Sequence, residues 1–225
     1  MRGIVILDEV KRVIREFGEN EYYHVFNRGV EKRLIFLDEQ DYNMFLYYIF
    51  IYLAEPKTVI AKYPTLPLRL RGKSLYHNVE LLAYCLMPNH FHFLLRQKSK
   101  DGVSKFLKQF TNAYTHYFNT KYKRVGGLMQ GRYKAARITS DEMLLHVSRY
   151  IHLYPLVASL VSDLANYKWS SYESYITGRK SPIVNTDIIL ARFPSKEAYK
   201  AFVLDQEGYG RELHKIEKAV LDLDD

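Results

Sequence analysis

The sequence predicts an α+β fold in which helices pack on one face of an antiparallel sheet. Two largely apolar runs, residues 79–87 and 90–95, flank the turn pair Pro88-Asn89 and are typical of a buried β-hairpin. Residues 104–122 place their apolar side chains at the i, i+3, i+4 spacing of a helix. The elements follow in the order β-α-β-β-α-β-α, which is typical of a ferredoxin-like or RRM-like layer.

The first half of the chain supplies a strand and a long helix. Residues 22–26 are mostly aromatic or β-branched, so they predict the first strand. The residues that follow, Asn27-Arg28-Gly29, are typical of a turn and would end this strand. Asp38 is a suitable N-cap for a helix over 39–55, and Pro56 would end it. Residues 10–17 predict a short amphipathic helix before this core.

The second half of the chain supplies the last strand and two more helices. Residues 132–139 predict a short strand, and Ser140 is a suitable cap for a helix that runs to about Leu153 and ends at Pro155. A further helix is expected around residues 196–205.

Four ranges describe the predicted domain organisation. Residues 1–180 form the main domain, with its core at about 22–178, and residues 181–225 form a C-terminal helical extension. Residues 56–78 hold three prolines and a basic cluster, which predicts a long irregular insertion.

Charge and composition narrow the class of partner. The 225 residues carry 33 basic and 25 acidic side chains, a net charge of +8, which favours a polyanion. Composition alone does not choose between nucleic acid and an acidic membrane surface. The single cysteine excludes an internal disulfide and a four-cysteine zinc site, and it is typical of a reducing compartment.

Membrane and nucleotide sites are not expected. The longest apolar run, residues 44–54, is about half of the ~20 residues that a membrane span needs, and no signal-peptide core is present. The sequence therefore predicts a cytoplasmic protein without a membrane partner. It also lacks a phosphate-binding Gly-x-x-x-x-Gly-Lys loop, so no nucleotide cofactor is expected.

His90 and His92 are the strongest candidates for chemistry. They lie two residues apart on a predicted strand, so both side chains leave one face while Phe91 leaves the other. Two imidazoles placed in this way can share one divalent metal ion. The alternative is a packed or exposed polar pair without a ligand.

Five sequence blocks in order resemble the REP-associated tyrosine transposases, which belong to the single-tyrosine HUH transposases. The His-hydrophobic-His pattern of His90-Phe91-His92 gives that superfamily its name. The resemblance covers about residues 22–178. Its blocks are Tyr22-Tyr23-His24-Val25-Phe26-Asn27-Arg28-Gly29, Tyr84 to His92, Gln130-Gly131-Arg132-Tyr133-Lys134-Ala135, Arg149 to Leu156, and Trp169-Ser170-Ser171-Tyr172.

The resemblance implies an enzyme that cuts and rejoins single-stranded DNA beside a hairpin. His90 and His92 would hold Mg²⁺ or Mn²⁺ at the scissile phosphate, and a tyrosine would attack it to form a 5′-phosphotyrosine link. Helical periodicity leaves Tyr114, Tyr117 and Tyr150 as candidate nucleophiles. The family block around Tyr150 implies that this residue is the nucleophile. Related enzymes include monomers and dimers, so a homodimer stays open.

Tyr154 departs from the family pattern. Relatives usually carry Asn at this position, and a neutral phenol is a poor metal ligand. The third ligand would then be His146, Tyr154 itself or water, or the metal would bind weakly. A second hypothesis follows, in which the chain is a weakly active or inactive domesticated relative that binds DNA hairpins. A third is an RRM-like RNA-binding domain, although the expected aromatic stacking block is absent from the strand of His90 and His92.

Basic and amide side chains near the proposed site are candidates for contact with DNA phosphates. They lie at the end of the first strand, in the insertion, on the helix over 104–122 and around the last strand. The set is Asn27, Arg28, Arg69, Arg71, Lys105, Lys108, Arg132, Lys134 and Arg137.

Overall fold

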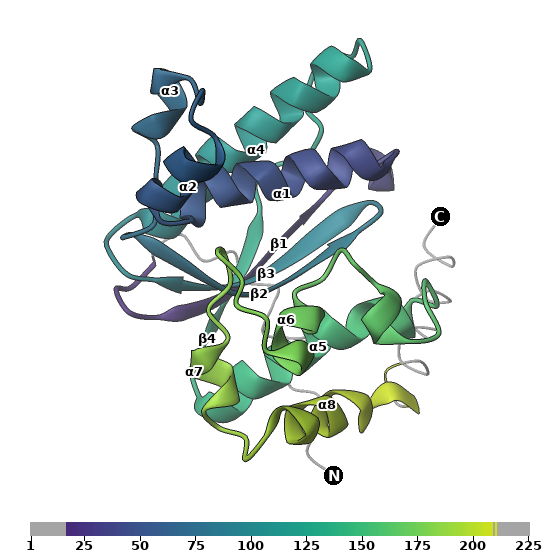
Figure 1. Cartoon of the computed structure of the whole chain (residues 1–225). Coiled ribbons are helices and arrows are strands. Elements are labelled where there is room, and N and C mark those ends of the chain that lie inside the picture. Colours follow the sequence, from purple (N-terminus) through teal and green to yellow (C-terminus); the bar gives the residue numbers. More distant parts are fainter. Residues whose placement is uncertain (1–16, 209, 211–225) are drawn as a thin grey trace.

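The computed structural model describes residues 17–208 and 210, and its centre is a four-stranded antiparallel sheet (Figure 1). The strands are β1 (Tyr22–Arg28), β2 (Val79–Met87), β3 (His90–Gln97) and β4 (Lys134–Ile138), in the order β2-β3-β1-β4. Every neighbouring pair is antiparallel. The predicted α+β class is confirmed, and Asn27 and Arg28 belong to β1 rather than to the turn after it.

Helices α1 (Glu39–Leu53) and α4 (Gly102–Lys121) cover one face of the sheet (Figure 1). Phe45 of α1 packs against Phe91 and Phe93 of β3, with ring centroids 5.4 and 6.2 Å apart. As predicted, the side chain of Asp38 caps α1, since it accepts a hydrogen bond from the backbone N–H of Asp41. This face forms an aromatic core.

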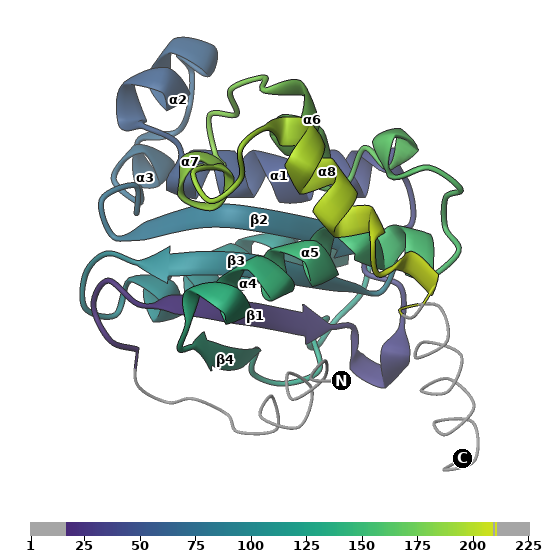
Figure 2. The same ribbon diagram turned by 90° about the horizontal axis from the view of Figure 1, so that it is seen from below.

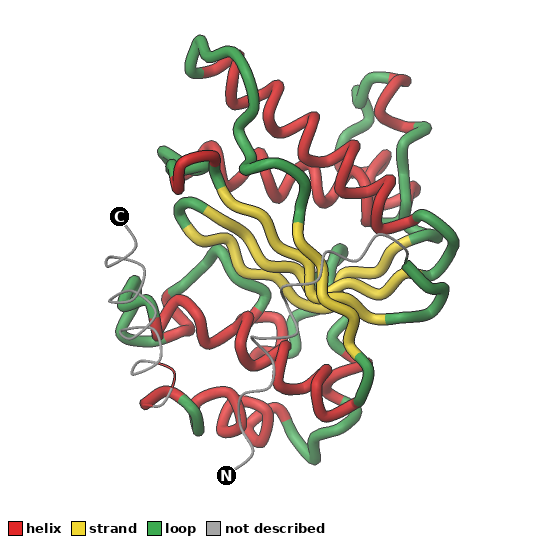
Figure 3. The backbone as a smooth tube through the Cα atoms, turned by 180° about the vertical axis from the view of Figure 1, so that it is seen from behind, coloured by secondary structure: helices red, strands yellow, loops and turns green. Residues whose placement is uncertain are grey.

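Helix α5 (Asp141–Val157) lies on the opposite face (Figure 2), so the expectation that helices pack on one face only is corrected. The physical reason is visible in β3, where Phe93, Leu94 and Leu95 are all fully buried. A strand that is apolar on both sides needs a cover on both sides. Figure 3 shows the sheet between the two helical layers.

Helix α5 begins where the sequence predicts and ends later. Ser140 caps it by accepting a hydrogen bond from the N–H of Met143. Pro155 lies inside the helix. The proline removes only one backbone hydrogen-bond donor, and burial of the Leu156 side chain stabilises the last turn. Tyr154 is therefore a helical residue, one turn after Tyr150.

The insertion over 56–78 is partly helical, which corrects the expectation of an irregular segment. It forms α2 (Pro56–Lys62) and α3 (Leu68–Arg71). Pro56 begins α2 instead of only ending α1, because proline fits the first turn of a helix. Val59 and Leu66 bury their side chains in a small cluster against the end of α1.

The segment after α5 packs on the outer side of that helix. It contains 3₁₀ helix η3 (Leu164–Asn166) and helices α6 (Tyr172–Thr177), α7 (Asp187–Leu190) and α8 (Lys196–Leu204). The predicted helix near 196–205 is confirmed as α8. The helix expected at 10–17 falls almost wholly outside the described residues, and a domain boundary near residue 180 stays a prediction.

One further 3₁₀ turn, η2 (Val30–Lys32), follows β1 at the end of the sheet where His90 lies. None of the helices in the described ranges is long and apolar enough to cross a membrane.

Candidate active site

The two predicted histidines lie on the face of the sheet that α5 covers. In the β1–β3 ladder His90 pairs with Arg28 and His92 pairs with Phe26. Phe91 is buried among aromatic rings on the α1 side, as the alternation of a strand predicts. The rings of His90 and His92 are 5.0 Å apart between centroids and nearly perpendicular.

Tyr150 and Tyr154 of α5 face this pair. They are one helical turn apart, so both rings come to the same side of the helix. The Tyr150 ring lies 5.5 Å from His92, and the Tyr154 ring lies 5.3 Å from His92 and 5.4 Å from His90. Two histidines from β3 and two tyrosines from α5 thus form one aromatic cluster.

His24 of β1 completes the cluster, and sequence reasoning assigned it no role. Its Nε2 lies 2.9 Å from Nδ1 of His92, and its ring is 5.8 Å from Tyr150. The alternation of β1 places His24 on the same face as Phe26 and Arg28. The missing information was the register between β1 and β3, because residues 24 and 92 are 68 positions apart.

Burial keeps the imidazoles of His24 and His92 neutral. Desolvation lowers the pKa of His24 from 6.5 to about 4. Desolvation also lowers the pKa of His92 well below its usual value, with smaller contributions from His90 and His24. Neutral imidazole is the form that binds a metal ion.

The described residues fit a metal ion in part. Nε2 of His92 is buried and has no hydrogen-bond partner within the described ranges, which suits a nitrogen reserved for a ligand. No group of three His, Cys, Asp or Glu side chains with metal-binding geometry occurs in the same ranges. The protein therefore offers His90 and His92, and imidazole nitrogen favours Mn²⁺ over Mg²⁺, which prefers oxygen ligands.

The other candidate tyrosines lie across the sheet. Tyr114 is fully buried and donates a hydrogen bond of 2.5 Å to the carbonyl oxygen of Ile35. Burial raises its pKa strongly, so its phenol stays protonated. Tyr117 donates to Asp41 of α1. Both belong to the α1–α4 layer and not to the histidine cluster.

His146 lies on the side of α5 that faces α8. Its Nδ1 is 2.5 Å from a guanidinium nitrogen of Arg149, and its ring packs on Phe202 at 5.9 Å. Desolvation, and secondarily Arg149, lower its pKa. The structure thus places Tyr154 beside the histidine pair and places His146 in the packing between α5 and α8.

Two of the candidate DNA contacts share the face of the histidines. Arg28 pairs with His90 in the ladder, and Lys134 pairs with Phe26 from the neighbouring strand. Lys134 is exposed. Asn27 is on the other face, where its amide donates to the carbonyl oxygen of Gly131 and accepts from the N–H of Arg28. The side-chain amide of Asn27 is therefore occupied by hydrogen bonds within the protein.

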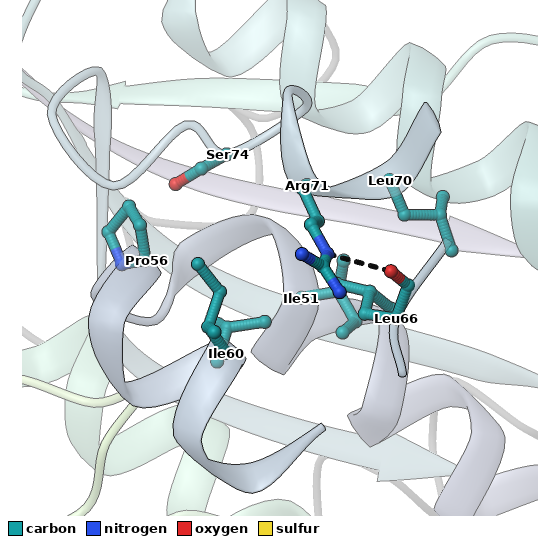
Figure 4. Close-up of a pocket in the computed structure, with 8 residues that line it drawn as sticks. Ile51, Pro56, Ile60, Leu66, Leu70, Arg71 and Ser74 are labelled. Carbon is teal, nitrogen blue, oxygen red and sulfur yellow. Dashed lines mark hydrogen bonds between the residues drawn. The ribbon is translucent and has the colours of Figure 1, made fainter. Parts of the chain in front are cut away.

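The remaining basic candidates lie elsewhere. Arg71 lies beside a small crevice of the insertion (Figure 4), where it donates hydrogen bonds to the carbonyl oxygens of Leu66 and Pro64. Lys105 and Lys108 are exposed on α4, and Arg137 forms an ion pair with Glu21. Arg69 is exposed on α3, and Arg132 stacks on the ring of Tyr133.

The sequence of the central part of the chain matches a known family. Residues 66–153 match a family model described as IS200-like transposase. The matched segment contains His90, His92 and Tyr150, and it ends one residue before Tyr154. A comparison with curated proteins finds no match.

One solved structure shares the fold of this chain. The structure of a REP-associated tyrosine transposase bound to a REP hairpin has a TM-score of 0.50 and 16% identity, and the match covers 79% of this chain and 93% of the other. A candidate transposase from Deinococcus radiodurans matches at a TM-score of 0.36 and 16% identity, over 62% and 95% of the two chains. The family match confirms the predicted resemblance to transposases over residues 66–153, and the first of these structures confirms the fold.

Proposed function

We propose that this chain, whose residues 66–153 match the IS200-like transposases, is a metal-dependent transposase that cuts and rejoins single-stranded DNA beside a hairpin. Support for the DNA hairpin as substrate comes from the fold likeness to a protein solved with a REP hairpin. The basic balance of the chain, +8, agrees with a nucleic-acid partner. DNA of this kind is an intracellular substrate, so we place the activity in the cytoplasm.

One observation carries the proposal: Tyr150 lies against His92 at a ring distance of 5.5 Å, on the face of the sheet where His90 also lies. The proposed nucleophile and two imidazoles therefore meet in a half-buried place on the sheet face that also carries two cationic side chains, Arg28 and Lys134. Tyr114 and Tyr117, the alternatives from periodicity, are held on the other face.

In the proposed reaction the phenolic oxygen of Tyr150 attacks the scissile phosphorus. A bond forms between phosphorus and that oxygen, and the bond from phosphorus to the 3′ oxygen breaks. The tyrosine proton passes to solvent, and the leaving 3′ oxygen takes up a proton. The product is a 5′-phosphotyrosine link with a free 3′-hydroxyl, and the same steps in reverse rejoin a strand.

His90 and His92 would hold Mn²⁺ or Mg²⁺ in this proposal. When bound, the ion neutralises charge on the non-bridging phosphate oxygens and orients the phosphate. His92 contributes its buried Nε2, and His90 lies at the open end of the strand beside the turn. Arg28 and Lys134 would contact phosphates on either side of the scissile one.

The test uses single-stranded DNA hairpins from the sequences that flank the gene, with Mn²⁺ or Mg²⁺ and a denaturing gel. We expect a covalent protein–DNA band that disappears with EDTA, in Tyr150→Phe and in His90→Ala. Tyr117→Phe, the matched control on the opposite face, should keep the band. A band that survives in Tyr150→Phe would contradict the assignment of the nucleophile.

A second candidate function is hairpin binding without chemistry. The observation that favours it is Tyr154, whose ring lies 5.4 Å from His90, one of the two proposed metal ligands. This alternative predicts tight hairpin binding on a native gel that survives EDTA and Tyr150→Phe, with no covalent band. Tyr154→Asn should then restore the band. Preference for the matching RNA hairpin would support the RNA-binding hypothesis instead.

A further inference from the structure

The buried contact between His24 and His92 has a chemical consequence for the proposed site. Nε2 of His24 is 2.9 Å from Nδ1 of His92, and each side chain is 5% exposed. Water does not supply alternative partners at such burial, so one ring must donate and the other must accept. The direction of this bond decides which nitrogen of His92 carries its proton.

The two directions leave His92 in different states. If His24 donates, Nδ1 of His92 accepts, and neutral His92 carries its proton on Nε2. That N–H would be buried without a partner in the described part of the chain, which is costly. If His92 donates from Nδ1, its Nε2 keeps a lone pair and can bind a cation.

We infer that His24 is a positioning residue that accepts the Nδ1–H of His92 and so presents the Nε2 lone pair of His92 to a divalent cation. The inference rests on the proposed function, because it assigns the supporting partner of a proposed metal ligand. Histidine ligands commonly need such a partner on their second nitrogen, which fixes both tautomer and ring orientation.

The packing around His24 supports this role. Its ring lies nearly parallel to His92, at 5.1 Å and 22°, and edge-on to Tyr150 at 5.8 Å. β1 pairs with β3 along the whole ladder, which fixes the backbone of His24 relative to that of His92. His24 therefore orients the proposed ligand while touching the ring of the proposed nucleophile.

The first experiment determines the tautomer of His92 by ¹⁵N NMR of histidine side chains in the metal-free full-length protein. We expect the Nδ1–H form in the wild type. The Nε2–H form in the wild type would overturn the inference, and this readout needs no variant and no activity.

The second experiment measures Mn²⁺ binding to the full chain without DNA, by electron paramagnetic resonance of the unbound ion. His24→Phe removes the acceptor and should weaken binding by about 10- to 100-fold. His24→Gln keeps an oxygen acceptor and should stay within a few-fold of wild type. His116→Gln, an exposed histidine on α4, is the matched control.

The outcomes separate this inference from the proposed function. Unchanged Mn²⁺ affinity in a folded His24→Phe would overturn the role of His24 and leave the transposase proposal intact. A wild-type chain that binds no Mn²⁺ would overturn both. If His24→Phe does not fold, His24→Ala takes its place. Equal weakening of Mn²⁺ binding in His24→Gln and His24→Ala would contradict the need for an acceptor. Weakening in His24→Ala alone would support it.

Discussion

His92 and His152 are both buried histidines, yet the protein uses their ring nitrogens differently. His152 is fully buried, with Nδ1 2.6 Å from the hydroxyl of Tyr199 and Nε2 2.7 Å from the hydroxyl of Ser171. His92 has one nitrogen paired to His24 and the other unpartnered within the described ranges. Complete pairing is typical of a structural anchor, and the unpartnered nitrogen of His92 is the one to which the proposal assigns a metal ion.

The anchor also explains how α5 is held. His152 joins α5 to Tyr199 of α8 and to Ser171, whose hydroxyl also accepts from the N–H of Tyr84 in β2. Arg149 lies over the ring of Phe202 at 4.3 Å on the same side. The outer layer thus fixes the helix that carries Tyr150, while the inner side of that helix meets the histidine pair.

The largest expected effect is the loss of the anchor. His152→Ala should lower the free energy of unfolding by about 4 kcal/mol, because it removes two buried hydrogen bonds and opens a cavity. Urea unfolding measures this change. A loss below about 1 kcal/mol would show that complete pairing does not distinguish His152 from His92.

The next effect is on activity. His92→Asn, whose amide N–H can replace the Nδ1–H donor to His24, should reduce covalent adduct formation by more than about 100-fold, since losing a ligand costs more than losing its supporting partner. Its free energy of unfolding should fall by about 1 kcal/mol, well short of the loss in His152→Ala, because the hydrogen bond to His24 can be kept. A large loss of stability with unchanged adduct formation would reverse the roles of the two histidines.

The pH dependence of stability tests the three buried histidines together. Desolvation lowers the pKa of His152 to about 3 and of His24 to about 4, and it also lowers the pKa of His92. The unfolded chain binds protons near pH 6.5, whereas the folded chain does not until lower pH. Stability is therefore full above pH 6.5 and falls below it, by up to about 1.4 kcal/mol per pH unit for each histidine.

His152→Gln checks this assignment. Urea unfolding of the metal-free chain between pH 7 and pH 5 measures the loss of unfolding free energy as the pH falls. We expect this loss to be smaller in the variant, by about the contribution of one histidine. An identical slope in the variant would mean that His152 is protonated in the folded state.

The smallest expected effect comes from Tyr199→Phe. This change removes one hydroxyl from the anchor and should cost about 1 kcal/mol of unfolding free energy, with Mn²⁺ affinity unchanged. Differential scanning calorimetry and Mn²⁺ titration check the two parts. Weaker Mn²⁺ binding in this variant would mean that the anchor and the ligand pair are coupled.

Sequence reasoning predicted the parts of the site that depend on local pattern. The two-residue spacing of His90 and His92 predicts a shared face, and the structure shows it. The helical caps at Asp38 and Ser140 were predicted for the same local reason. The family block singled out Tyr150, and the fold places it against His92.

The rest depends on tertiary context. Nothing local in residues 22–28 pairs His24 with His92, because that contact depends on the register of two strands distant in the chain. The continuation of α5 through Pro155 depends on the burial of Leu156. Sequence also left Asn27 among the DNA contacts, whereas the strand turns it to the other face.

The central claim is that Tyr150, held against His92, is the residue that becomes joined to DNA. The most direct measurement is tandem mass spectrometry of the protein after reaction with a hairpin DNA, Mn²⁺ and nuclease digestion. The account predicts a nucleotide phosphate on Tyr150. The same modification on Tyr154, Tyr114 or Tyr117 would contradict the account. So would a protein that binds the hairpin efficiently but carries no modified tyrosine.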